Sequence, residues 1–334
     1  MTARSFLTAL VISATFPALA EDAVSPLDPA PIETLGTVLV HGTQPAPGLW
    51  TATRDGKQIL LMATLAPTPK GISWSSPEVM KRIASVQEII DAPGVRVSAD
   101  IGPLRGALLW PAYRKSQRNP DSQTLRDVLS PELYARWQVA KNLYLTGDRS
   151  VEYLRPVHAA RRLFEAAVSR HGLSNEDIVA PAVHQIAKKH SIPVKQTLHP
   201  LVIREPREAL KALSQTSLED TQCMQQTLDR LDTDIEQMAV RGNLWAEGDV
   251  DALLSSPFVD QKSACIAAFA ASALARAEGI EDLDAQVRQS WLTAVYASLA
   301  NHDLVFAMVP LDRLEGEKGV LATLRAAGFE VQDP

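Results

Sequence analysis

The stretch PGLWTATRDGKQILLMATLAPTPKGISWSSPEVMKRIASVQEII, residues 47–90, decides the fold class. Residues 49–54 and 58–65 are two strand candidates, and Asp55-Gly56 between them is typical of a tight hairpin because both residues tolerate positive φ. The second strand candidate is almost wholly apolar, which indicates that both of its faces are covered. The stretch therefore predicts a hairpin whose second strand lies inside a larger sheet.

A helix and a third strand follow the hairpin. Ser76 can cap the first turn of a helix, and proline at the next position is tolerated there because its missing N–H would have no helical partner. Residues 88–91 are a short strand candidate, which Pro93-Gly94 ends. The order hairpin, helix, strand is typical of an α/β protein.

The C-terminal end has a similar order of elements. Residues 304–309 predict a strand, 318–327 a helix that Gly328 ends, and 329–331 a last strand. Between the two ends, apolar residues recur at helical spacing, most clearly in the helix that begins at Leu218. We therefore predict an α/β fold in which βα units from both termini build one mixed central sheet around a large helical middle section.

The first residues have the features of a signal peptide. Arg4 is followed by the apolar run FLTALVISATFPALA, and Ala18-Leu19-Ala20 fits the small residues of a cleavage site. Cleavage after Ala20 would make the protein periplasmic or secreted, and an uncleaved membrane anchor is the alternative. No later run reaches the ~18 apolar residues of a membrane span, so no integral segment is expected after cleavage. The predicted organisation is a signal peptide at 1–20, a flexible leader at 21–36 and one domain at 37–334, with its helical insert at about 123–300.

Composition narrows the classes of partner. The formal net charge is −6, and both signs are spread along the chain. Because no basic stripe with interleaved aromatic residues occurs, we expect no nucleic-acid partner. The sequence also contains no polybasic amphipathic helix of the kind that lies on membranes.

The chain has two cysteines, Cys223 and Cys265. In an oxidising compartment an even count favours a disulfide, which would close a loop of 43 residues. Chain entropy then gives roughly 4 kcal/mol of stabilisation before strain is subtracted. Two buried thiols in adjacent helices are the alternative.

Both ends of the chain resemble the TraB/GumN family (TraB/PrgY/GumN/TIKI-like). Residues 47–90 resemble the opening of that family's proteins, in which a Leu-Trp strand precedes an apolar strand that ends in Gly-Thr-x-His. The stretch DLVFAMVPLDRLEGEKGVLATLRAAGFEVQ, residues 303–332, resembles the second half-motif, where an apolar strand ends in Gly-x-x-His. The resemblance implies metal-dependent peptide hydrolysis, because His and Glu side chains can hold an ion that lowers the pKa of a bound water.

This chain departs from the family at both His motifs. The first motif falls on Ala63-Thr64-Leu65-Ala66 and the second on Ala307-Met308-Val309-Pro310, so Ala66 and Pro310 occupy the ligand positions. Asp91 stands where a glutamate is expected, and Arg288-Gln289 where the family has Arg-Asn. Methyl and pyrrolidine side chains have no lone pair for a metal. The departures therefore predict no catalytic residue, no metal and no cofactor, and a vestigial pocket formed by Thr64, Ala66, Asp91, Arg288 and Pro310.

Other residues give no clear replacement for this site. His184 and His190 are six apart on a predicted helix and so do not share a face, and His199-Pro200 is expected in a turn. Asp91 and Arg288 have an alternative reading, as a solvated carboxylate beside a turn and an ordinary cation on a helix surface.

The functional hypothesis is a catalytically degenerate family member, a pseudoenzyme. It would bind or scaffold an unknown peptide, protein or small polar ligand in the periplasm. One alternative is a metal-dependent peptide hydrolase with a rebuilt site that includes Asp91. The other is an accessory role in envelope polysaccharide production, which rests only on the GumN part of the family name.

Overall fold

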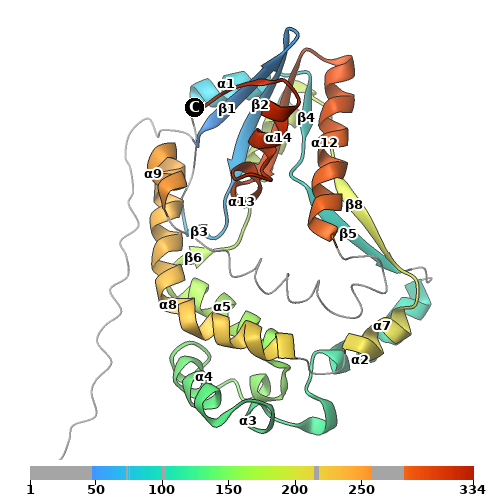
Figure 1. The fold of residues 1–334 in the computed structure, drawn as a ribbon, viewed down its shortest axis with the longest axis vertical. Coiled ribbons are helices and arrows are strands. Elements are labelled where there is room, and N and C mark those ends of the chain that lie inside the picture. Colours follow the sequence, from blue (N-terminus) through green and yellow to red (C-terminus); the bar gives the residue numbers. More distant parts are fainter. Residues whose placement is uncertain (1–46, 73, 75, 100–102, 214–217, 257–281) are drawn as a thin grey trace, which may run out of the picture. The chain divides into compact units, whose positions relative to one another are not determined.

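A computed structural model describes residues 47–72, 74, 76–99, 103–213, 218–256 and 282–334 (Figure 1). The signal peptide, the leader and Cys265 lie outside these residues. Cys223 is described, and it is buried in helix α8 (Leu218–Glu247). The disulfide between the two cysteines therefore stays a prediction. Among the helices of the described ranges, none combines the length and the apolar character needed to cross a bilayer.

A six-stranded mixed sheet joins the two ends of the chain, as predicted. In the order of the sheet its strands are β10 (Glu330–Gln332), β1 (Leu49–Arg54), β2 (Lys57–Thr64), β9 (Leu304–Pro310), β4 (Glu88–Ile90) and β7 (Val194–Lys195). β1 and β2 form the expected antiparallel hairpin, with φ of 54° at Asp55 and 76° at Gly56. β2, β9, β4 and β7 run parallel to one another, and β10 pairs antiparallel with β1.

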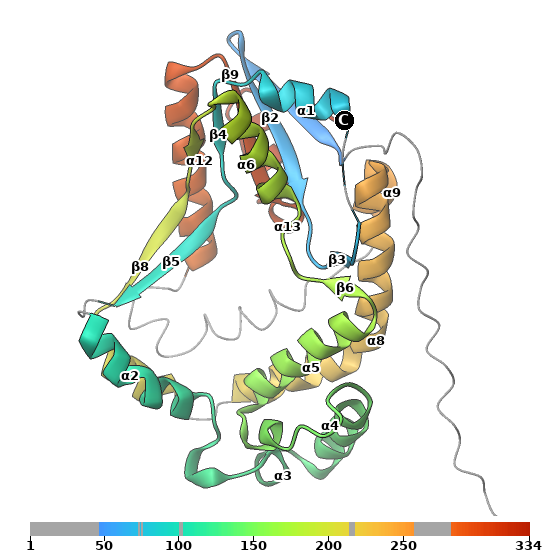
Figure 2. The same ribbon diagram turned by 180° about the vertical axis from the view of Figure 1, so that it is seen from behind.

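Helices cover both faces of this sheet, which is why β2 and β9 are apolar almost throughout. On one face lie α1 (Pro77–Ala84) and α6 (Val179–His190), which contact each other. On the other face lies α12 (Leu283–Asn301), which buries Val287, Trp291 and Leu299 (Figures 1 and 2). The chain continues from β9 into α13 (Leu311–Leu314) and α14 (Val320–Ala326).

A separate two-stranded sheet was not predicted from the sequence. β5 (Gly94–Ala99) pairs in parallel with β8 (Leu198–Ile203), so that Val97 lies opposite Leu201. The prediction of a turn at His199-Pro200 is wrong, because both residues lie within β8. Proline is tolerated there because a two-stranded sheet leaves one side of each strand without a ladder partner. Each strand leads into a helix, α2 (Pro103–Ser116) after β5 and α7 (Pro206–Leu213) after β8, and the two helices contact each other.

The middle of the chain forms a second hydrophobic cluster from helices. The predicted apolar stripe of α8 is confirmed. Met224, Leu231, Ile235 and Met238 are buried in this cluster, and Leu228 is partly buried against it. Ser130 caps α4 (Pro131–Tyr144) by accepting a hydrogen bond from Leu133 N. The remaining elements of the described chain are α3 (Leu125–Val128), α5 (Pro156–Arg170), α9 (Val250–Ser255), β3 (Thr68–Pro69), β6 (Leu173–Ser174) and the short 3₁₀ turns Pro120–Ser122 and Ser150–Tyr153.

A buried ion pair joins the beginnings of α5 and α8. Arg155 Nη2 and Nε lie 2.6 and 2.7 Å from Asp220 Oδ2, and the two side chains are 7% and 9% exposed. A buried charge without its partner is far less stable than one in water, so the two residues depend on each other.

We predict that Asp220→Ala lowers the free energy of unfolding by about 3–5 kcal/mol, because it leaves the Arg155 guanidinium buried without its counter-charge. Urea denaturation measures the change. Asp229→Ala is the matched control on the same helix: its pair with Arg136 is 2.7 Å long, but the side chains are 44% and 46% exposed. The control should cost about 1 kcal/mol or less. Equal losses in the two variants would contradict the prediction.

Candidate functional site

The ends of β2 and β9 lie side by side. In the parallel register Thr64 is opposite Pro310, the last residue of each strand. β4 is the next strand, and its last residue, Ile90, is opposite Ala307 of β9. The carboxyl ends of parallel strands meet at one edge of a sheet. Thr64, Asp91 and Pro310 therefore lie at the same edge. Ala66 comes two residues after β2 and is exposed.

Apolar groups and backbone contacts occupy this edge. The indole of Trp245 in α8 donates to the carbonyl of Ala63 over 2.9 Å, and this bond is buried. Pro310 is the N-cap residue of α13, and Leu311 after it is buried. The strand ends are therefore closely packed against helices, and Pro310 turns the chain directly from strand to helix.

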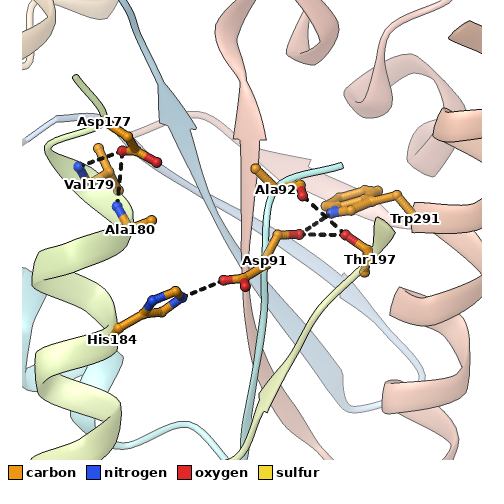
Figure 3. A network of polar contacts seen from close by, with 8 residues as sticks. All are labelled: Asp91, Ala92, Asp177, Val179, Ala180, His184, Thr197 and Trp291. Atoms are coloured by element: carbon orange, nitrogen blue, oxygen red, sulfur yellow. Dashed lines mark hydrogen bonds and ion pairs between the residues drawn. The ribbon is translucent and has the colours of Figure 1, made fainter. Parts of the chain in front are cut away.

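Asp91 carries a carboxylate at this edge, and both its backbone and its side chain are held by hydrogen bonds (Figure 3). Its carbonyl oxygen accepts hydrogen bonds from Trp291 Nε1 at 2.9 Å and from Thr197 Oγ1 at 3.0 Å. Its carboxylate Oδ1 lies 2.6 Å from His184 Nε2. The Asp91 side chain is 18% exposed and that of His184 is 43% exposed. The pair is thus fixed in position and open to solvent on the histidine side.

His184 is the site residue that sequence reasoning missed. It lies on α6, whose first turn is capped by Asp177 through hydrogen bonds from the backbone N–H groups of Val179 and Ala180 at 2.8 and 3.1 Å (Figure 3). The capped helix packs along the sheet and directs His184 toward Asp91, which is 93 residues earlier in the chain. Spacing along one helix could not reveal this partner, because it belongs to a different element.

Arg288 lies in a different setting. Its guanidinium is 3.7 Å from Asp284, whose other carboxylate oxygen is 2.7 Å from Arg313. With His199 and Ser290 it lines an open hollow of about 460 Å³. The described residues contain no hydrogen bond or ion pair between Arg288 and Asp91. The structure thus brings Thr64, Asp91 and Pro310 to one edge and places Arg288 in a separate charged cluster.

His199 in β8 contacts α12. Its Nδ1 is 2.8 Å from Ser290 Oγ, and its Nε2 is 3.1 Å from Gln286 Oε1. Elsewhere, burial, with Arg155 and Arg161 nearby, lowers the pKa of His158 to about 4, so this imidazole is neutral near pH 7. Neither histidine approaches the strand-end carboxylate through a hydrogen bond within the described part of the chain.

The donor set at the strand ends does not fit a catalytic metal. Of the residues gathered there, Asp91 and His184 alone offer a carboxylate and an imidazole, whereas a catalytic zinc site has three protein ligands. Throughout the ranges that the structure describes, no group of three or more His, Cys, Asp or Glu side chains could hold a metal ion.

The family profile of TraB/PrgY/gumN proteins matches residues 48–333. The chain belongs to the TraB/PrgY/gumN family. Comparison with curated proteins gave no match, and neither did comparison with solved structures. The matched residues include both the sheet and the helical middle section. In this family member β2 ends at Thr64 and β9 at Pro310, Ala66 follows β2 and Asp91 follows β4.

We predict strong coupling between the two side chains that hold the Asp91 carbonyl. Thr197→Val and Trp291→Phe should each lower the free energy of unfolding by about 1 kcal/mol or more, because each removes one donor. The double variant should lose about 1 kcal/mol more than the two single losses together, since neither side-chain donor then remains for that carbonyl. Urea unfolding of the four proteins gives the coupling, and strictly additive losses would contradict it.

Proposed function

We propose that this TraB/PrgY/gumN protein is a non-hydrolytic member of its family that acts outside the cytoplasm by binding a peptide, protein or small polar ligand. The observation that carries the proposal is the register of the sheet. β2 and β9 end level with each other at Thr64 and Pro310, so the strands that would present the family's histidines are side by side. The positions that the resemblance assigns to those histidines hold Ala66 and Pro310.

The chemistry of this edge favours binding over hydrolysis. Metal-assisted hydrolysis needs several nitrogen or oxygen ligands to hold the ion and to lower the pKa of its water. A methyl group and a pyrrolidine ring can take neither part. The Asp91–His184 pair remains, partly exposed and fixed at 2.6 Å, and it can accept and donate hydrogen bonds to a polar ligand.

The extracytoplasmic location rests on the N-terminal sequence. Arg4, the apolar run after it and Ala18-Leu19-Ala20 have the order of a cleavable signal peptide. An oxidising compartment would also suit the proposed bond between Cys223 and Cys265.

Metal analysis tests the proposal. The purified chain, dialysed against zinc and then manganese, should retain far less than one equivalent of either ion, because the edge offers one carboxylate and one imidazole. Peptide mixtures incubated with either ion should remain uncleaved. Near-stoichiometric metal that supports peptide cleavage would overturn the proposal.

A second candidate is a hydrolase with a rebuilt site, and the Asp91–His184 contact favours it. The Asp91 carboxylate can accept a hydrogen bond from Nε2 of His184 and so orient the imidazole. Nδ1 of the ring can then take a proton from water as a general base. This arrangement would not need the lost histidines. It would still need a group to stabilise the developing negative charge.

This candidate predicts that Asp91→Ala and His184→Ala each abolish a measurable hydrolytic activity without lowering the melting temperature. The activity would be sought with peptide and ester substrates. His190→Ala on the same helix and Asp303→Ala at the opposite end of β9 are the controls, because both residues are exposed and should be silent. Activity that persists in both site variants would exclude the Asp91–His184 pair as the rebuilt site.

A further inference from the structure

A second hollow lies at the edge of the sheet where β2 begins, opposite to the edge that carries Asp91. The tip of the β1–β2 hairpin and the last turns of α12 are found at this end of the sheet (Figures 1 and 2). With the segment that follows α14 they line an open hollow of about 460 Å³. Its lining includes Arg54, Lys57, Tyr296, Leu299, Ala300 and Phe329. A hollow of this volume is large enough for a small organic ligand.

Most of this lining is apolar or aromatic. The rings of Tyr296 and Phe329 are stacked, with their centroids 6.4 Å apart and an angle of 23° between their planes. Leu299 and Ala300 belong to the last turn of α12. These side chains form a surface against which the flat ring of a ligand can pack.

Two cations line the same hollow. Arg54 and Lys57 flank the hairpin turn and are directly opposite each other in the register of β1 and β2. Side chains at opposite positions of an antiparallel pair lie on one face of the sheet, and two like charges placed there repel each other. The Arg54 guanidinium also lies over the Phe329 ring, 4.4 Å from its centroid. The polar part of the hollow is therefore cationic and adjoins its aromatic part.

Hydrogen bonds to the ends of two helices offset these charges in part. Arg54 Nη1 donates to the carbonyl of Ala327, the C-cap residue of α14, over 2.7 Å. Lys57 Nζ donates to the carbonyl of Leu299 in the last turn of α12. The C-terminal end of a helix carries about half a unit of negative charge, so the two helix ends offset roughly half of the two positive charges.

The nearest carboxylate adds little to this compensation. Asp55 Oδ2 lies 3.6 Å from Arg54 Nε, but the Asp55 side chain is 88% exposed, so water screens its charge. Arg54 and Lys57 also have more N–H donors than these contacts use. The hollow thus offers about one positive charge, with free donors, beside a surface of aromatic and apolar side chains.

We infer that this hollow binds an aromatic carboxylate, a ligand with one negative charge and a flat ring. Its carboxylate accepts hydrogen bonds from Arg54 and Lys57 and so relieves the repulsion between them. Its ring packs against Tyr296 and the last turn of α12. A neutral aromatic compound would leave the two cations facing each other. A ligand with several negative charges, such as a nucleotide, would bring more charge than the hollow compensates.

The same chemistry occurs in a small free acid and in the C-terminal residue of a peptide that ends in an aromatic side chain. The hollow is separate from the Asp91–His184 pair, so the inference does not depend on the proposed function. Sequence analysis missed it, because Arg54, Tyr296 and Phe329 come from three distant parts of the chain.

Ligand-detected NMR titration of the purified protein with hydrocinnamate tests the inference. Hydrocinnamide has the same shape without the charge, and propionate has the charge without the ring. Each should bind at least about tenfold more weakly than hydrocinnamate, because each lacks one of the two sets of contacts. Equal affinity for either compound, or no detectable binding of hydrocinnamate, would overturn the inference.

A peptide then distinguishes the two sources of the carboxylate. Acetyl-Ala-Ala-Phe with a free C-terminus that binds as tightly as hydrocinnamate, or more tightly, assigns the hollow to a peptide terminus. Weaker binding of this peptide assigns the hollow to a free acid. The C-terminal amide of the peptide is the uncharged control.

Two pairs of variants locate the binding. Ala300→Trp places a large ring at the wall of the hollow and should abolish hydrocinnamate binding, whereas Ala297→Trp, at an exposed position of the same helix outside the lining, should not change it. Arg54→Gln should weaken binding at least about tenfold. Arg325→Gln is its matched control, because Arg325 is 48% exposed and 3.7 Å from Asp333, whereas Arg54 is 42% exposed.

Equal losses in a variant and its control would overturn the assignment to this hollow. If Arg54→Gln fails to fold because it loses the bond to Ala327, the tryptophan pair and the three small ligands still decide the inference.

Discussion

The parallel pairing of β2 with β9 is the constraint on which the rest of the structure depends. It joins the N-terminal hairpin to a strand near the C-terminus, with seven residues of β2, from Gln58 to Thr64, in register with seven of β9. Both strands are buried on both faces, so the pairing also forms the centre of the main hydrophobic core. Because the two strands are parallel, the chain must return from the end of β2 to the start of β9 by a long crossover connection. The helical middle section lies within that long connection.

The same pairing determines what the strand ends can do. With Thr64 opposite Pro310, two positions at which the family resemblance implies metal ligands follow adjacent strand ends. An imidazole at either place could offer a nitrogen to a metal ion, whereas the side chains of alanine and proline offer none. The absence of histidine from these two positions therefore does not come from a lost strand or a shifted register, because both strands are present and paired.

Asp91 is held in place from several elements of the fold. Its carbonyl is held from α12 by Trp291 and from the segment before β8 by Thr197, and its carboxylate meets His184 from α6. Helices on opposite faces of the sheet thus converge on one residue. The hydrogen bond from Trp291 to the Asp91 carbonyl serves the packing of α12 whether or not the carboxylate has a chemical role. Arg288, although only three residues before Trp291, is directed to a cluster with Asp284.

The sequence by itself determined the order of elements at both ends, the hairpin at Asp55-Gly56, the core stripe of α8 and the cap at Ser76, whose Oγ accepts a hydrogen bond from Val79 N. These features depend on neighbours within a few residues, so residue type and period are sufficient to indicate them. It also determined which side chains stand at the family's ligand positions. Tertiary structure alone decided that β5 pairs with β8, that His184 meets Asp91 and that Arg288 does not join them. Those contacts connect residues about a hundred or more positions apart, and their partners are selected by which faces pack together, which no local pattern records.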